Sequence, residues 1–211
     1  MARIKVEDIP LRSYFKGIPG KDKWQWLGDK SGDFSVKFVR SLLQKDRGSG
    51  CTSFVWCKWL PLKVNVFAWR ADLNRLPTIE GLRRRNVMVD DQTYVFCNEG
   101  EDSVSHLFIE CVAANVVWNM ISGWCHVPQI FASSFQDLMK VYQFSGLKDP
   151  EKSIFQGVLI IACWSLWKAR NEVRFRNKPF RIEKIISEVK SVSFLWVRNR
   201  TKFKNLSWAN W

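Results

Sequence analysis

Three residues in the middle of the chain have the types and the spacing of metal ligands. Cys97, His106 and Cys111 form the pattern C-x8-H-x4-C within the stretch YVFCNEGEDSVSHLFIEC. Thiolates and imidazoles are preferred zinc ligands, and a structural zinc site usually has four of them in a tetrahedron. A fourth ligand is expected two or three residues before Cys97, where Tyr94 stands. The pattern indicates a metal site that lacks one ligand; the alternative is a chance grouping in a chain with six cysteines.

A turn and a helix would have to bring these ligands together. The polar segment NEGED, which follows Cys97, has the composition of a turn. The segment from His106 to Met120 has apolar residues at helical spacing, which predicts a helix that starts at the histidine. One turn of that helix would place His106 and Cys111 beside a common ion.

The rest of the chain predicts a mainly α fold with a small N-terminal β-hairpin. In KWQWLGDKSGDFSVKF, apolar and polar residues alternate on both sides of DKSGD, so Trp24 and Trp26 would pair with a strand that contains Phe34. Pro61 is expected to start one helix and Thr78 to cap another, which would extend to Arg85. Further helices are predicted after Ser35, within SSFQDLMKVYQF, over 152–174 and over 181–200.

The apolar spacing also predicts which residues face the core. In the helix after Pro61 the inward positions include Leu62 and Trp69, and Trp164 and Trp167 are expected in the core of a later helix. The longest apolar run, from Ile154 to Trp167, is too short and too interrupted to cross a bilayer and predicts a buried helix.

The chain is strongly basic, with a formal net charge of +13. The charge is +9 over residues 1–90, −5 over 91–150 and +9 over 151–211, so two basic segments flank the acidic segment with the metal pattern. A basic balance favours polyanionic partners, because each Lys or Arg at a phosphate releases counterions. The N-terminus is too polar for an export signal, so free thiols and an intracellular location, in the nucleus or the cytoplasm, are expected.

Several long segments resemble a known family. FSVKFVRSLL, VWCKWLPLKVNVFAWRADLNRLPTIEGLRRRNV, CNEGEDSVSHLFIEC and VVWNMISGW are similar to the zinc-binding domain of plant LINE-type (non-LTR) retrotransposon reverse transcriptases. The tail, with ACWSLWKARNEVRF and LSWANW, resembles the segment that often follows this domain. The resemblance implies a zinc site of the form C-x2-C-x7-8-H-x4-C, in which Cys97, His106 and Cys111 are the last three ligands.

The first ligand of the family pattern falls on Tyr94. A neutral phenol with a pKa near 10 is a poor zinc ligand at pH 7, so a weak or vestigial zinc site is predicted. Water, or Cys125 or His126, could complete the tetrahedron; alternatively, the Tyr94 ring packs where the fourth ligand would lie.

No catalytic constellation is found. Asp90 and Asp91 are similar to the paired carboxylates of reverse transcriptases, but no aromatic residue precedes them and they follow a basic helix, so a solvated turn is favoured. The chain is therefore expected not to be an enzyme.

Basic residues gather in two segments and could bind phosphates. The candidate nucleic-acid-binding residues are Arg70, Arg75, Arg83, Arg84, Arg85, Lys168, Arg170, Arg174 and Arg176. A solvated basic face is the simpler alternative.

These observations divide the chain into an N-terminal extension (1–23), a zinc-binding-like domain (24–122), a connecting segment (123–150) and a basic helical C-terminal region (151–211). The predicted function is a non-catalytic accessory module that binds RNA or DNA, and a truncated retrotransposon product would fit the chain length. No membrane partner is expected. The alternative is a structural module that docks on another protein. A product with no selected function is a third hypothesis.

Overall fold

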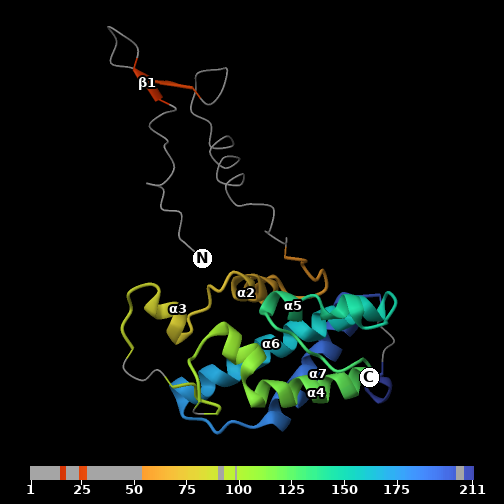
Figure 1. Cartoon of the computed structure of the whole chain (residues 1–211). Coiled ribbons are helices and arrows are strands. Elements are labelled where there is room, and N and C mark those ends of the chain that lie inside the picture. The colour runs from red at the N-terminus through yellow and green to blue at the C-terminus, as the bar shows by residue number, and fades with distance from the viewer. Residues whose placement is uncertain (1–14, 18–23, 28–53, 90–92, 98, 203–206) are drawn as a thin grey trace. The chain divides into compact units, whose positions relative to one another are not determined.

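The computed structural model describes residues 15–17, 24–27, 54–89, 93–97, 99–202 and 207–211. The chain divides into two units, Met1–Ser53 and Phe54–Trp211. Within the described residues the second unit is built mainly from helices (Figure 1), as the sequence predicts. The predicted helix after Ser35 and the pair Asp90–Asp91 lie outside the described residues.

Two short strands are described in the first unit. β1 (Phe15–Gly17) pairs antiparallel with β2 (Trp24–Trp26), with Phe15 opposite Trp26. The predicted hairpin instead joins the segment of Trp24 and Trp26 to Phe34, which lies outside the described residues. The predicted hairpin is therefore not supported.

The second unit begins with two helices whose starts the sequence predicts. α2 (Leu62–Asp72) follows Pro61, which stands at its N-cap. α3 (Ile79–Arg83) is capped by Thr78, whose side chain accepts a hydrogen bond from the Gly81 N–H at 3.1 Å. α3 is shorter than predicted, because Asn86 follows it with a left-handed backbone (φ 59°).

The predicted helix from His106 is interrupted at Cys111. One π-helical turn, η3 (His106–Glu110), is followed by α4 (Val112–Cys125), and Cys111 between them has an extended backbone (φ −67°, ψ 130°). Helical periodicity continues across this break, so the sequence pattern does not reveal it. Single π turns inside helices occur frequently at functional sites.

The remaining elements form the C-terminal half of the unit. α5 (Phe135–Leu138) and η4 (Val141–Phe144) are short and lie in the segment where one helix is predicted. α6 (Glu151–Arg176) and α7 (Ile182–Arg200) are long and match their predicted positions within two residues. A final 3-10 turn, η5, covers Trp208–Asn210.

α6 lies at the centre of the second unit, in contact with α2, α4, α7, η3 and η4 (Figure 1). Every residue from Phe155 to Cys163 is buried, as predicted for this apolar run. Residue 157 in this stretch is a glycine, and a Cβ there would lie 2.0 Å from the ring of Trp59. A larger residue would therefore clash with the tryptophan. None of the described helices combines the length and the apolar character that a membrane span requires.

The inward face of α2 differs from the prediction. Leu62 is 71% exposed and Trp69 is 38% exposed, whereas Phe67 and Ala68 are buried. Asn65 is also buried. Its side-chain amide accepts a hydrogen bond from the N–H of Cys57 at 2.9 Å and donates one to the Cys57 carbonyl at 3.0 Å. With Asn65 buried, the face of α2 that packs on the core differs from the face that the spacing of apolar residues predicts. Trp167 is in the core as predicted, and the partly buried Trp164 packs against the core.

Candidate metal centre

The structure brings the three predicted ligands together. One ligand atom from each of Cys97, His106 and Cys111 lies within 4.8 Å of the others. The Sγ atom of Cys97 is 3.2 Å from Nε2 of His106. Cys111 is buried, and the His106 side chain is 12% exposed. Two thiols and one imidazole therefore converge on a small volume with little solvent contact.

A short loop carries Cys97 to the other two ligands. Thr93 and Glu101 form an isolated antiparallel bridge that closes this loop. Gly100 lies just before the bridge with φ +71°, a conformation that L side chains rarely adopt. A Cβ at Gly100 would lie 2.8 Å from Nδ1 of His106. Glycine at this position lets the loop backbone lie against the imidazole ring. We call residues 93–111 the knuckle.

The break between η3 and α4 places Cys111 at the N-terminus of a helix. Cys111 is the N-cap of α4, although its side chain makes no capping hydrogen bond. Burial raises the pKa of the Cys111 thiol, and the nearby backbone N–H groups of Ala114 and Ala113 act in the opposite direction. A helix N-terminus stabilises negative charge, which suits a thiolate ligand.

Both nitrogens of the His106 ring have a polar neighbour. Nε2 faces Cys97, while Nδ1 lies 3.7 Å from Oε2 of Glu110. Metal-binding histidines commonly donate their second ring N–H to a carboxylate, which fixes the ring and raises its basicity as a ligand. The His106 backbone N–H donates to Oγ of Ser103 at 2.9 Å. The histidine is therefore positioned for a metal on its Nε2 side.

Tyr94, at the sequence position of the missing ligand, has a buried ring. Its side chain is fully buried, and its ring packs edge-on against His106 with centroids 4.7 Å apart. Burial, followed by the charges of Cys111, Asp102 and Cys97, raises the pKa of the Tyr94 hydroxyl. Among the residues that the structure describes, that hydroxyl has no hydrogen-bond partner. A neutral buried phenol does not replace a thiolate as a zinc ligand.

Cys125 and His126 do not complete the site. They lie at the C-terminal end of α4, whereas Cys111 lies at the opposite end. Fourteen helical residues separate these ends, which corresponds to about 20 Å at the usual rise. Burial also raises the pKa of the Cys125 thiol to about 12. This separation excludes the alternative in which Cys125 or His126 completes the tetrahedron.

The residues present fit a metal ion with three protein ligands. Cys97, His106 and Cys111 would bind the ion and thereby crosslink the loop to the start of α4. The Tyr94 hydroxyl, which has no partner among the described residues, marks a polar position beside this site. A Cys2His set is compatible with zinc, whose fourth ligand is then a water or another oxygen donor.

The N-terminal group of predicted nucleic-acid-binding residues surrounds the turn between α2 and α3. The guanidinium groups of Arg70 and Arg85 donate to the carbonyl of Arg75 at 3.3 and 2.9 Å. Arg84 donates to the carbonyl of Asn74 at 3.0 Å. All these arginines are exposed. We call Arg70, Arg75, Arg84 and Arg85 the turn cluster.

Arg83 is set apart from the turn cluster, although it is adjacent in the sequence. Its Nη1 lies 2.7 Å from Oε1 of Glu101. Arg84 also has an acidic neighbour, since its Nε lies 3.6 Å from Oε1 of Glu80. Within the described part of the chain, no carboxylate lies within ion-pair distance of Arg70, Arg75 or Arg85.

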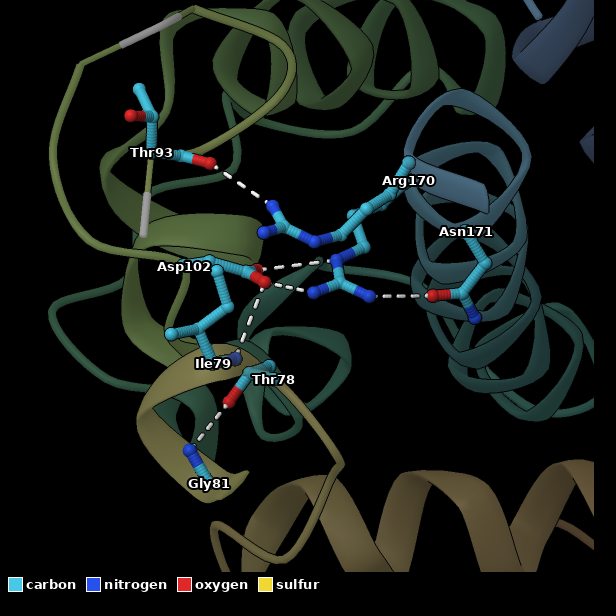
Figure 2. A network of polar contacts seen from close by, with 8 residues as sticks. Thr78, Ile79, Gly81, Thr93, Asp102, Arg170 and Asn171 are labelled. Carbon is cyan, nitrogen blue, oxygen red and sulfur yellow. Dashed lines mark hydrogen bonds and ion pairs between the residues drawn. The ribbon is translucent and has the colours of Figure 1, made fainter. Parts of the chain in front are cut away.

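Most residues of the second basic group, on α6, contact other segments of the protein. Arg170 is 1% exposed and forms an ion pair with the fully buried Asp102 (Figure 2). Arg174 donates to the Thr93 carbonyl at 3.1 Å, and Lys168 pairs with Glu188. Of this group, Arg176 is exposed. The prediction that Arg170 contacts nucleic acid is wrong, because its guanidinium does not face solvent.

Sequence reasoning did not identify Asp102 as a site residue. It belongs to the polar segment NEGED, where every acidic side chain has the same expected role in a solvated turn. Its partner Arg170 is far away in the sequence. No local signal distinguishes Asp102 from its neighbour Glu101, which is exposed.

The fold and the site define the protein class as a helical module with a candidate Cys2His metal centre. Residues 34–118 match the family model of the zinc-binding domain in reverse transcriptase. This match supports such a domain in that part of the chain, and it includes all three ligands of the centre. No curated protein and no solved structure matches the chain.

Proposed function

We propose that the protein is a zinc-binding accessory module of the kind found in plant LINE-type (non-LTR) retrotransposon reverse transcriptases. The observation that carries this proposal is the convergence of Cys97, His106 and Cys111 within 4.8 Å inside the segment that matches the family model. Zinc would stabilise the knuckle and take no part in a reaction. The module itself is non-catalytic in this proposal and supports a polymerase that lies elsewhere.

The proposed ligand of the module is RNA or DNA. The turn cluster supports this role, because it presents exposed guanidinium groups beside one turn. Guanidinium groups bind phosphates in a bidentate geometry, and their binding to a polyanion releases counterions. The formal net charge of +13 acts in the same direction.

Zinc content and thermal stability, measured for the wild type and for Tyr94→Cys, test the metal proposal. We expect the wild type to bind one zinc weakly and Tyr94→Cys to bind one zinc at least about tenfold more tightly, because a fourth thiolate completes the tetrahedron. The gain in melting temperature with zinc should be larger for the variant. Tyr94→Phe is the matched control, since it removes only the hydroxyl.

Two results would contradict the metal proposal. Failure of both proteins to bind zinc would show that the three residues are a chance grouping. Equally tight binding by the wild type and Tyr94→Cys would show that an additional ligand already completes the site.

A second candidate function is docking on another protein through exposed apolar side chains, among which Leu62, Phe144 and Phe175 are at least 71% exposed. Titration of the full chain with a heterologous RNA at several salt concentrations separates the two functions. Salt-sensitive binding supports the nucleic-acid role. Absence of RNA binding together with a specific protein partner supports the docking role.

A further inference from the structure

We propose that Arg170 is a positioning residue for the metal centre, and that α6 holds the knuckle in its ligand-bearing geometry whether or not a metal is bound. Arg170 lies outside residues 34–118, the segment that matches the zinc-binding family model. The inference assigns the C-terminal region of the chain a role in the metal-binding module. Figure 2 shows the contacts that carry it.

The first step is the bidentate contact between Arg170 and Asp102. Both nitrogens of the contact, Nε and Nη2, donate to the carboxylate, with Nε at 3.3 Å from Oδ1. Asp102 is fully buried and Arg170 is 1% exposed. A buried ion pair fixes two segments firmly, because displacement of either partner would leave an uncompensated charge in the interior. A forked guanidinium contact also fixes orientation.

The second step is the position of Asp102 within the knuckle. Its carboxylate accepts the N–H of Ile79 at 3.3 Å, and its carbonyl accepts the N–H of Glu80 at 3.1 Å. Asp102 therefore joins the knuckle to the N-terminus of α3 as well as to α6 (Figure 2). The next residue, Ser103, accepts the backbone N–H of His106. A fixed Asp102 thereby fixes the start of the turn that carries the histidine ligand.

The third step is a second contact from α6, one helical turn after Arg170. Arg174 donates to the carbonyl of Thr93 at 3.1 Å. Thr93 is paired with Glu101 in the bridge that closes the Cys97 loop. Arg170 and Arg174 therefore contact both chain segments at the base of the knuckle. With these contacts in place, the geometry of the ligands does not depend on the metal alone.

The guanidinium of Arg170 is also fixed by its own surroundings. It lies 5.1 Å from the ring centre of Trp167 and 5.7 Å from that of Phe175. Nη1 donates to Oδ1 of Asn171 at 2.8 Å. Lysine has the same charge but lacks the planar fork, so it cannot make both contacts to the carboxylate.

Hydrogen exchange of the metal-free full chain tests this role directly. We expect Arg170→Met to speed exchange at the amides of His106, Leu107 and Cys111 by about a hundredfold, since breaking a buried ion pair releases the knuckle. Arg170→Lys keeps a positive charge beside Asp102 and should speed the same amides by about tenfold. If Arg170→Met does not fold, Arg170→Lys alone tests the proposal. Wild-type exchange at these amides in the folded variants would overturn the proposal.

Val197→Ala is the matched control. Val197 is fully buried in α7. It is far in the sequence from Arg170 and Arg174, the residues that contact the knuckle. This variant should lower the global stability yet leave the exchange of the knuckle amides unchanged relative to the other protected amides. Equal acceleration of the knuckle in Val197→Ala and Arg170→Lys would overturn a specific role for Arg170.

A titration with Co²⁺, followed by its thiolate absorption, adds a readout of the ligands themselves and rests on the proposed metal site. Arg170→Lys should weaken Co²⁺ binding by about tenfold to a hundredfold, as mutations of residues that orient metal ligands do. Val197→Ala should leave the affinity unchanged. If the wild type binds no Co²⁺, the metal proposal fails, and the hydrogen-exchange result still decides the role of Arg170.

Discussion

The two groups of basic residues look alike in the sequence and have different surroundings in the structure. Arginines of the turn cluster are exposed and donate to backbone carbonyls of Asn74 and Arg75. In the second group, Arg170 and Lys168 pair with carboxylates of other segments. A guanidinium on a carbonyl keeps its full positive charge available to a ligand, whereas one paired with a carboxylate does not. Arg170 and Lys168 therefore have less charge available to a polyanion than Arg70 and Arg85 of the turn cluster.

The same contrast occurs between two adjacent acidic residues of the knuckle. Asp102 is fully buried with Arg170, and Glu101 is exposed with Arg83. We expect Asp102→Asn to lower the free energy of unfolding by about 3–5 kcal/mol, because it leaves the guanidinium buried without a counter-charge. Glu101→Gln should lower it by about 0.5 kcal/mol, as for other exposed pairs. Urea unfolding of the three proteins measures both effects, and equal losses would contradict the distinction.

The sequence predicts the helices better than their contacts. Local signals such as Pro61 and Thr78 place the starts of α2 and α3 correctly, since capping is a local interaction. The three candidate metal ligands, which the structure brings together, are likewise found from their types and spacing. These predictions depend on residues that are close together in the chain.

Features that depend on distant partners were not predicted. Asn65 is buried because its amide bonds the backbone at Cys57, and periodicity alone treats an asparagine as a surface residue. Asp102 is buried because Arg170 lies opposite it in the folded chain. In both cases a polar side chain is satisfied by a group that its own sequence neighbourhood does not contain.

A smaller effect is expected when single basic residues of the two groups are compared in RNA binding. Arg85→Ala removes an exposed guanidinium that has no carboxylate partner among the described residues. It should reduce the slope of log affinity against log salt by about 0.7 for a single-stranded RNA. Lys168→Ala should leave the slope unchanged, because the lysine is already paired with Glu188. Fluorescence anisotropy at several salt concentrations measures both slopes; equal reductions would show that both groups contact the RNA.

The smallest effect on stability is expected from Glu172, near the point where α6 ends and α7 begins. Glu172 lies 3.3 Å from Nζ of Lys178 and 3.1 Å from Nζ of Lys184, and its side chain is 31% exposed. The hydrogen bonds from Lys184 and Lys178 hold the pKa of the Glu172 carboxyl below its usual value. A carboxyl with a lowered folded-state pKa stabilises the protein above its unfolded-state pKa of about 4.3 and loses this effect as the pH falls through the folded value.

Glu172→Gln should therefore lower the free energy of unfolding by about 0.5 kcal/mol at pH 7, the usual size for exposed ion pairs. At a pH below the folded-state pKa of Glu172, the two proteins should be equally stable, because the wild-type carboxyl is then neutral as well. Urea unfolding across this pH range measures the difference. A difference that persists at the acidic end would show that the carboxyl acts through neutral hydrogen bonds. In that case the charge of Glu172 beside Lys178 and Lys184 would not be the source of its effect on stability at this end of α6.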